Sequence, residues 1–340
     1  MLRPCIKDLS WTELQSVVEG LGEPPYRAGQ VYEWLYGRAV GSFGEMSVLP
    51  ARLRSSLEGA YAIDALKKLR ERRSRDGTVK YLLELADGKT IETVLIPTAK
   101  RKTVCLSSQV GCRFGCPFCA SGMAGFERNL GQGELLDQVV AVKRGGIAVT
   151  HVVFMGIGEP LDNYDNLARA VAVLNDRRGF GIGSRRIAIS TCGLVDGIER
   201  LAREGPALEL SVSLHAPEDG LRDRLVPINR KYPLKGLVAA CGKYYAKTKR
   251  VVTFEYVLID GINDSPAMAR KLSALLGGFD CKVNLIKLGR VPVEGIAPSP
   301  RESVRRFLSA LRERGVKVTL RRQRGADVEA ACGQLRLRAI

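Results

Sequence analysis

The chain has 340 residues, which is enough to bury at least one large core and to form two or three domains, or one barrel with an appendage. Its 53 Lys and Arg against 36 Asp and Glu leave a net charge of +17, an excess that suits a polyanion such as a nucleic acid. No stretch approaches the ~20 apolar residues that cross a bilayer, and the first residues lack the apolar core of a secretion signal. We therefore expect no membrane segment and a cytoplasmic protein, in which clustered cysteines indicate metal binding or catalysis more often than structural disulfides.

The basic residues gather in four segments, at residues 67–75, 100–102, 243–250 and 305–324. Solvent-facing helix surfaces account for many such runs when they are taken one by one. They do not explain the imbalance over the whole chain, so a nucleic acid is the first candidate partner.

Two kinds of periodicity divide the first hundred residues. Residues 10–60 carry apolar residues at helical spacing, and Ser10 is typical of a helix N-cap. Between residues 77 and 97 the spacing changes to the two-residue period of strands, with Asp87 and Gly88 as the turn of a hairpin. We predict a helical accessory domain over residues 1–75, a β-hairpin extension over 76–97 and a main domain over 98–340.

The main domain alternates short apolar strands with longer helical segments, the pattern of a parallel sheet wrapped by helices. The predicted strands cover residues 103–109, 151–156, 186–191, 208–214, 251–259, 282–288 and 317–322. The predicted helices cover residues 134–143, 167–175, 195–203, 267–276 and 302–314. Six or seven such units are too few for an eight-fold barrel, so we expect an open, partial barrel. In such folds the carboxyl ends of the strands build the site.

Three cysteines, Cys112, Cys116 and Cys119, lie close together just after the first strand of this domain. A closed zinc site needs four ligands, and the chain offers no second C-x-x-C pair and only two distant histidines. An iron–sulfur cluster usually takes four cysteines, so three would leave one iron free to bind a substrate. The spacing favours an open [4Fe-4S] cluster over zinc, and both over a structural trio of thiols.

This C-x3-C-x2-C arrangement resembles the radical S-adenosylmethionine (SAM) superfamily, in which the free iron chelates the methionine part of SAM. The segment "MGIGEP" at residues 155–160 resembles that superfamily's GGEP motif, which implies that Gly158 and Glu159 lie near the amino group of SAM. Further residues end the third and fourth predicted strands, where they also suit cofactor binding; they are Ser190, Ser213, Leu214 and His215. Each of these residues alone is weak evidence for a cofactor site, but together they favour one because they lie at the ends of successive strands. The resemblance implies a partial (β/α)6 barrel of the TIM type and two cofactors, SAM and the [4Fe-4S] cluster.

Longer segments resemble the RlmN/Cfr family of radical SAM RNA adenine methyltransferases in collinear order from about residue 10 to 336. They include "SSQVGCRFGCPFCASGMAGFERNL", "LHAPEDGLRDRLVPINRKYPL" and "RGADVEAACGQL". The resemblance implies that Cys332 carries a methyl group to the base, that Cys105 forms a transient disulfide with Cys332, and that Glu92 removes the proton from the base. It also implies that the helical N-terminal domain binds RNA.

Alternatives stay open for several of these residues. By pattern alone, Glu92 is more simply an exposed residue on the polar face of a strand. Four other cysteines are interpreted as small buried hydrophobes, namely Cys5, Cys192, Cys241 and Cys281. Gly289 stands where the family has a cofactor-contacting asparagine, so that contact is either lost or made by the backbone.

The expected activity is methylation of C2 of an adenosine in 23S rRNA, with tRNA as a possible second substrate. C8 methylation, as in Cfr, uses the same machinery and is one alternative. A divergent paralogue with another RNA target is a second alternative, and a non-catalytic iron- or zinc-binding RNA module is a third. We also expect an electron donor such as flavodoxin or ferredoxin, and a monomer.

Overall fold

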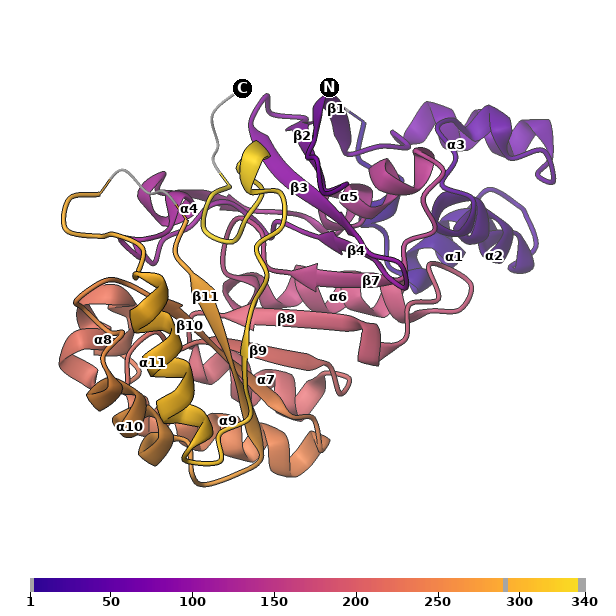
Figure 1. Cartoon of the computed structure of the whole chain (residues 1–340). Coiled ribbons are helices and arrows are strands. Elements are labelled where there is room, and N and C mark those ends of the chain that lie inside the picture. Colours follow the sequence, from indigo (N-terminus) through magenta and orange to yellow (C-terminus); the bar gives the residue numbers. More distant parts are fainter. Residues whose placement is uncertain (1–2, 290–292, 336–340) are drawn as a thin grey trace.

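The N-terminal part is helical, as expected. A computed structural model describes residues 3–289 and 293–335. After a short 3₁₀ turn (Ile6–Asp8) come α1 (Trp11–Gly20), α2 (Tyr26–Tyr32), a π-helical turn (Glu33–Gly37) and α3 (Ala51–Ala60) (Figure 1). Ser10 caps α1: its hydroxyl accepts from the Glu13 N–H at 3.2 Å, and the Glu13 carboxylate accepts from the Ser10 N–H at 2.6 Å. This capping box satisfies two amide groups that a helix N-terminus otherwise leaves unpaired.

Three antiparallel strands follow, β1 (Leu66–Arg73), β2 (Val79–Leu85) and β3 (Thr90–Pro97). The hairpin of β2 and β3 confirms the turn predicted at Asp87 and Gly88. Strand β1 was not predicted: helical spacing was expected over residues 10–60, and β1 falls within the predicted helical accessory domain of residues 1–75. Nearly every side chain of β1 is exposed, so its charge-rich sequence carries no strand periodicity, and its pairing with β2 is what makes it a strand.

The main sheet is open and mostly parallel, as the sequence indicates. Its ten strands run in the order β1-β2-β3-β4-β7-β8-β9-β10-β11-β12, and every pair from β4 onwards is parallel. The parallel strands are β4 (Lys102–Cys105), β7 (His151–Phe154), β8 (Ile187–Thr191), β9 (Glu209–Ser213), β10 (Val252–Leu258), β11 (Cys281–Lys287) and β12 (Val318–Leu320). All seven overlap the predicted strands, and the six crossovers between them make a partial (β/α)6 barrel.

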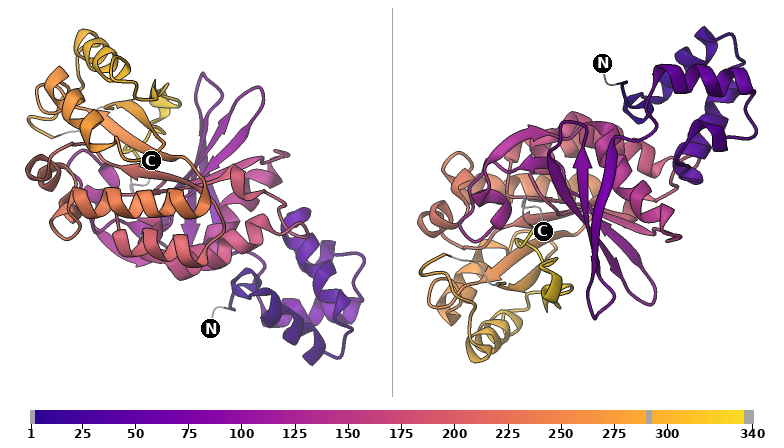
Figure 2. Two further views of the ribbon diagram at one scale, coloured as in Figure 1. Left: turned by 90° about the horizontal axis from the view of Figure 1, so that it is seen from below. Right: turned by 90° about the horizontal axis from the view of Figure 1, so that it is seen from above.

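Helices connect these strands and cover the outside of the sheet, while the segment after β12 lies across its other face (Figures 1 and 2). They are α5 (Gln132–Arg144), α6 (Tyr164–Asn175), α7 (Val195–Glu204), α9 (Leu234–Thr248), α10 (Pro266–Leu275) and α11 (Arg301–Arg312). A smaller two-stranded sheet, β5 (Gln109–Gly111) with β6 (Phe126–Asn129), flanks the short helix α4 (Ala120–Met123). Of these helices, α9 was not among the predicted ones.

A buried ion network joins the N-terminal part to the barrel. Lys7 is fully buried, and its ammonium lies 2.8 Å from Asp64 and 2.5 Å from Asp137 of α5. Arg144, at the end of α5, contacts both carboxylate oxygens of Asp64. Buried charges are tolerated only when they are paired in this way, so the network fixes how the helical part sits on the barrel. Figure 2 shows that part at the opposite end of the molecule from α11.

None of the helices in the described parts of the chain combines the length and the apolar character that a membrane crossing requires.

Candidate active site

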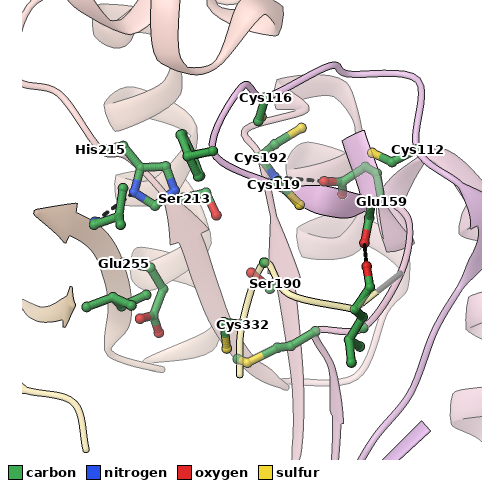
Figure 3. Close-up of a pocket in the computed structure, with 18 of the residues that line it drawn as sticks. Cys112, Cys116, Cys119, Glu159, Ser190, Cys192, Ser213, His215, Glu255 and Cys332 are labelled. Carbon is green, nitrogen blue, oxygen red and sulfur yellow. Dashed lines mark hydrogen bonds between the residues drawn. The ribbon is translucent and has the colours of Figure 1, made fainter. Parts of the chain in front are cut away.

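One pocket of about 1090 Å³, including its open mouth, lies at the carboxyl ends of the parallel strands (Figure 3). It gathers most of the residues singled out from the sequence, although they are up to 220 positions apart in the chain. They are Cys112, Cys116, Cys119, Gly158, Glu159, Ser190, Ser213, His215, Gly289 and Cys332. The predicted site residues that do not line the pocket are Leu214, Cys105 and Glu92.

The loop with the three cysteines runs from β5 to α4 and is held by its own backbone. The N–H of Cys112 donates to the carbonyl of Gly125 at 2.8 Å, and the N–H of Cys119 donates to the carbonyl of Cys116 at 3.0 Å. Gly111 has φ +78°, and a Cβ there would lie 1.8 Å from the Gly125 oxygen, so only glycine allows the two arms of the loop to approach. Burial raises the pKa of the Cys112 thiol to about 12 and also raises the pKa of Cys116.

Glu159 is buried in the pocket wall, and its carboxylate is held by backbone amides. One oxygen accepts from the Cys192 N–H at 2.7 Å and the other from the Leu161 N–H at 3.1 Å. The Glu159 N–H itself donates to the side chain of Gln109, the first residue of β5, at 2.8 Å. Burial raises the pKa of Glu159 to about 7. Gln109 therefore ties the glycine-rich loop after β7 to the strand that leads into the cysteine loop.

His215 sits at the end of β9 with an unusual backbone conformation, φ +60°. Its Nδ1 accepts a hydrogen bond from the Val257 N–H at 3.0 Å, so the neutral ring carries its proton on Nε2. Burial lowers the pKa of His215 to about 3, which keeps the ring neutral at physiological pH. Phe118 of the cysteine loop packs edge-on against the imidazole at 4.8 Å between ring centroids. The ring is thus fixed as a hydrogen-bond donor against the cysteine loop.

Ser190 and Ser213 reach the pocket from the ends of β8 and β9, whereas the side chain of Leu214 lies in the hydrophobic core. The backbone of Leu214 is used within the fold: its N–H donates to the Glu255 carbonyl at 3.0 Å. The structure thus places Leu214 behind the pocket wall and not in it.

A fully buried arginine, Arg222 of α8 (Asp219–Leu225), holds these strand ends together. Its guanidinium donates to the carbonyls of Leu214 at 3.1 Å, Cys192 at 2.7 Å and Ser213 at 2.9 Å. A fourth bond, at 2.8 Å, goes to the side chain of Asn229. Sequence reasoning missed this residue because one arginine among fifty-three basic residues carries no signal that it is buried.

Cys332 is exposed and reaches the pocket from the segment after β12, across from the three clustered cysteines (Figure 3). Cys105 lies on β4 in a buried cluster with Val328 and Leu335 of the same segment, and burial raises the pKa of its thiol to about 12. Arg321 also lines the pocket, 3.8 Å from the buried Glu255 of β10. The neighbouring Cys332 is the largest cause that raises the pKa of Arg321, so the guanidinium lies close to that side chain.

Glu92 is completely buried, which contradicts the alternative of an exposed residue on a polar strand face. Its carboxylate pairs with the Lys80 ammonium at 2.9 Å. Val94 is directly opposite Cys105 in the sheet, so their side chains lie on the same face. Glu92 lies two residues before Val94 on the same strand, and its side chain therefore lies on that face as well. That face is covered by the segment that carries Cys332, since Lys80 also donates to the Glu329 carbonyl at 3.5 Å.

Of the four cysteines interpreted as buried hydrophobes, Cys5 and Cys241 are buried and Cys281 is half-buried. Cys192 differs, because it lines the pocket next to Glu159.

Comparisons with known proteins agree with this geometry. Residues 106–272 match the family model of the Radical SAM superfamily, and residues 6–63 match that of the ribosomal RNA large subunit methyltransferase N-terminal domain. A probable dual-specificity RNA methyltransferase RlmN from Desulforudis audaxviator is 54% identical and covers 90% of this chain and 97% of its own. The RlmN of Syntrophobacter fumaroxidans is 45% identical and covers 97% of each chain. The chain belongs to the RlmN family.

A crystal structure of a radical SAM methyltransferase from Sphaerobacter thermophilus is also similar to this RlmN-family chain throughout. It has a TM-score of 0.95 and 46% identity, and it covers 98% of this chain and 100% of its own. The match includes the N-terminal helices, so the helical part and the barrel form the same arrangement in both proteins. The N-terminal family match ends at residue 63, just before β1, which agrees with the boundary seen in the structure.

Membership of the RlmN family implies a [4Fe-4S] cluster and SAM, and the donor set of this chain suits both. Three thiols on one loop can each bind a different iron, and they lie in the same pocket as the buried Glu159 carboxylate, which can take an ammonium group. Within residues 3–289 and 293–335, no three His, Cys, Asp or Glu side chains converge closely enough to hold a single metal ion. A four-iron cluster needs no such convergence, because its ligands surround a larger group.

Proposed function

We propose that this RlmN-family chain methylates C2 of an adenosine in 23S rRNA through a methyl group carried on Cys332, and that tRNA is a second substrate. The observation that carries the proposal is that Cys332 and the three clustered cysteines line one pocket, although they lie more than 200 residues apart. The curated relatives are described as dual-specificity RNA methyltransferases, which supports two kinds of RNA substrate.

In this proposal, Cys112, Cys116 and Cys119 hold the cluster. Glu159 accepts hydrogen bonds from the amino group of SAM, Gly158 allows close approach of the backbone, and Ser190, Ser213 and His215 bind the rest of the molecule. The side chain of Leu214 does not contact the cofactor in this proposal, because it lies in the hydrophobic core behind the pocket wall. When bound, the cluster and SAM supply a methyl group and a 5′-deoxyadenosyl radical. That chemistry is required because C2 of adenine lies between two ring nitrogens and is too electron-poor to attack an electrophilic methyl group.

Cys332 acts first, as a nucleophile that accepts the methyl group on Sγ. The thiolate is the reactive form of a cysteine nucleophile, and the Arg321 guanidinium lines the same pocket as Cys332. Cys332 is exposed, so the base of the RNA can approach the sulfur from the mouth of the pocket. A base that is stacked within folded RNA must first be swung out to reach it.

Glu92 and Cys105 finish the reaction in this scheme. The Lys80 ammonium stabilises the ionised form of Glu92, which is the form that can accept the proton from C2. By then the carbon on Sγ of Cys332 is bonded to the base. Cys105 attacks this Sγ, so the disulfide forms as the bond between sulfur and carbon breaks; the carbon keeps the electron pair and takes up a proton, which releases the base with its new methyl group. Two observations support the roles of this pair: both lie on the sheet face beneath the Cys332 segment, and Cys105 packs against that segment.

The RNA is held by basic surface near the sheet edge. Strand β1 forms that edge, and its basic side chains are exposed; they are Lys67, Lys68, Arg70, Arg72 and Arg73. Together with the N-terminal helices, they would bind phosphates. We further propose that the chain acts as a monomer in the cytoplasm and takes electrons from a flavodoxin or ferredoxin.

The experiment uses anaerobically reconstituted protein with SAM, a reductant and either 23S rRNA or tRNA. The RNA is digested to nucleosides and compared by mass spectrometry with 2-methyladenosine and 8-methyladenosine standards. We expect 2-methyladenosine from both RNAs. The C8 product would point to Cfr-type activity, and an unmodified RNA despite 5′-deoxyadenosine formation would indicate another target.

A further inference from the structure

Arg321 brings to the pocket a guanidinium group whose donors the fold does not use. Its side chain is 32% exposed and lines the pocket, so a bound molecule can reach it. A guanidinium has five N–H donors and no acceptor. Arg222 makes four hydrogen bonds with its donors, whereas no hydrogen bond joins the Arg321 guanidinium to any residue within 3–289 and 293–335. The donors of Arg321 are therefore available to a ligand.

The sheet determines where this guanidinium lies. The Arg321 N–H donates to the Leu285 carbonyl at 2.8 Å, so the residue continues the pairing of β12 with β11. Thr319, two residues earlier, bonds the side chain of Asn284, and alternation along a strand puts Thr319 and Arg321 on one face. Asn284 in turn donates to Oε1 of Glu255 at 3.2 Å. Arg321 therefore shares a face of the sheet with the Glu255 carboxylate.

Glu255 supplies the opposite charge without using the donors. It is buried, it lines the pocket, and its Oε2 lies 3.8 Å from Nη1 of Arg321. That distance is too long for a hydrogen bond, so the attraction between the charges holds the guanidinium at this place and leaves its N–H groups unpaired. An arginine held in this way is prepared to donate to an acceptor in the pocket.

The guanidinium lies on the side of the pocket that receives the base. Cys332 is the nearest contributor to the raised pKa of Arg321, and both residues line the pocket. Figure 3 shows Glu159 beside the cysteine loop and Glu255 on the opposite side of the pocket, towards Cys332. The carboxylate of SAM is bonded to the same carbon as its amino group, so it stays at the Glu159 side. The acceptor that meets Arg321 therefore comes from the RNA.

Adenine has suitable acceptors next to its reacting carbon. When C2 meets the carbon carried on Sγ of Cys332, the ring nitrogens N1 and N3 are each one bond away from C2, and both accept hydrogen bonds. A donor at either nitrogen positions C2 and draws electron density out of the ring. The carbon that adds to C2 lies next to sulfur and is electron-rich, so withdrawal of density from the ring favours the addition.

We propose that Arg321 is a catalytic residue that donates a hydrogen bond to a ring nitrogen beside C2 of the target adenine, either N1 or N3. The inference rests on the proposed function of Cys332. It deepens that function, because it names the group that recognises the edge of the base at which the carbon is added.

Binding measured without a reductant tests the contact apart from turnover. The probes are three labelled fragments of 23S rRNA that carry adenosine, 1-deazaadenosine or 3-deazaadenosine at the position where mass spectrometry locates the methyl group. In fluorescence anisotropy, the wild type should bind one deaza RNA about tenfold more weakly than the adenosine RNA, which corresponds to about 1.4 kcal/mol. Arg321→Met should bind all three RNAs with the same, weaker affinity. Equal affinity of the wild type for the three RNAs would overturn the proposal.

The steps of the reaction are then measured separately in Arg321→Met. The variant should carry a methyl group on Cys332, seen by peptide mass spectrometry, and bind S-adenosylhomocysteine within twofold of the wild type, because its lost contact is with the base. At saturating RNA, product should form about 10²–10³-fold more slowly, the loss expected for one hydrogen-bond donor at a reacting group. An unmethylated Cys332 would assign Arg321 to the thiol, and weak S-adenosylhomocysteine binding would assign it to SAM; either result overturns the proposal.

Two further variants exclude a general disturbance of the pocket. Arg322→Met is the matched control, because Arg322 is exposed and does not line the pocket, and it should stay within twofold of the wild type in each measurement. Arg321→Met leaves the buried Glu255 without its cation, so Arg321→Met combined with Glu255→Gln removes that charge as well. The slow product formation should persist in the double variant, and recovery there would overturn the proposal.

A failure of the proposed function gives a different result. Wild-type protein that distinguishes the deaza RNAs and carries a methyl group on Cys332, yet forms no 2-methyladenosine, would refute the proposed function. Normal 2-methyladenosine formation by Arg321→Met would refute the role of Arg321 alone.

Discussion

Replacing Arg222 with methionine should both destabilise the protein and damage the pocket. The side chain is fully buried, and its four hydrogen bonds join the ends of β8 and β9 to helix α8. Methionine has a similar length and no donors, so the carbonyls of Cys192, Ser213 and Leu214 would be left without partners.

The magnitude follows from two opposing effects. Hydrogen bonds from a charged donor contribute about 1.5–3 kcal/mol each. Burial also lowers the pKa of Arg222, which means that the fold bears a cost for keeping this charge away from water, and methionine removes that cost. We therefore expect a net loss of about 3 kcal/mol in the free energy of unfolding. We also expect at least a tenfold loss of S-adenosylhomocysteine affinity, because Ser213 and His215 would shift.

Urea unfolding followed by circular dichroism measures the first effect, and calorimetry measures the second. Arg224→Met is the matched control, since Arg224 lies on the same helix but is exposed, and it should change stability by less than about 0.5 kcal/mol. The reasoning fails if Arg222→Met unfolds at the same urea concentration as Arg224→Met and binds the ligand equally well.

Three further predictions concern buried or reactive groups. Lys7→Met should destabilise the protein by about 3–5 kcal/mol at neutral pH by leaving Asp137 unpaired, whereas Lys7→Met with Asp137→Leu should recover most of the loss in urea unfolding. Because burial raises the pKa of Asp137, the single-variant loss should shrink as the pH falls and the carboxyl becomes neutral; a loss that grows on acidification would contradict this sign. Glu92→Gln should still methylate Cys332, seen by peptide mass spectrometry, yet form product RNA about 10²–10⁴-fold more slowly, and near-normal turnover would remove Glu92 from the mechanism. Cys105→Ala should methylate Cys332 but keep RNA covalently attached in denaturing gels, a result that free methylated RNA would rule out.

The fold was predictable because its elements have strong local signals. The seven parallel strands are short apolar runs separated by helical segments, and Ser10 marks a helix start that the capping box confirms. Strand β1 could not be predicted, because its exposed basic residues form a strand only by pairing with β2. Local pattern thus fails where a partner strand, and not burial, determines the structure.

The pocket was predictable in part for a related reason. Glu159 and His215 lie in the loops that follow β7 and β9, so parallel topology brings them to one edge of the sheet, whereas the three cysteines are brought there by the loop between β5 and α4. Leu214 shares that position, yet its side chain turns into the core, because neighbouring residues at a strand end point to opposite faces. The same alternation buries Glu92, which pattern alone would have left exposed.

The residues that sequence reasoning missed are those that hold the pocket in shape. Gln109 and Arg222 are polar side chains whose hydrogen-bond partners belong to distant segments. Such residues carry no periodic signal, and in a chain with 53 basic residues a buried arginine cannot be recognised by its residue type.

These polar residues also share a physical role. The strand ends and the cysteine loop come from separate parts of the chain, and backbone pairing alone leaves their carbonyl and amide groups unsatisfied. Long polar side chains that satisfy them fix the distance from Glu159 to the cysteine loop, and so determine whether one bound molecule can contact both.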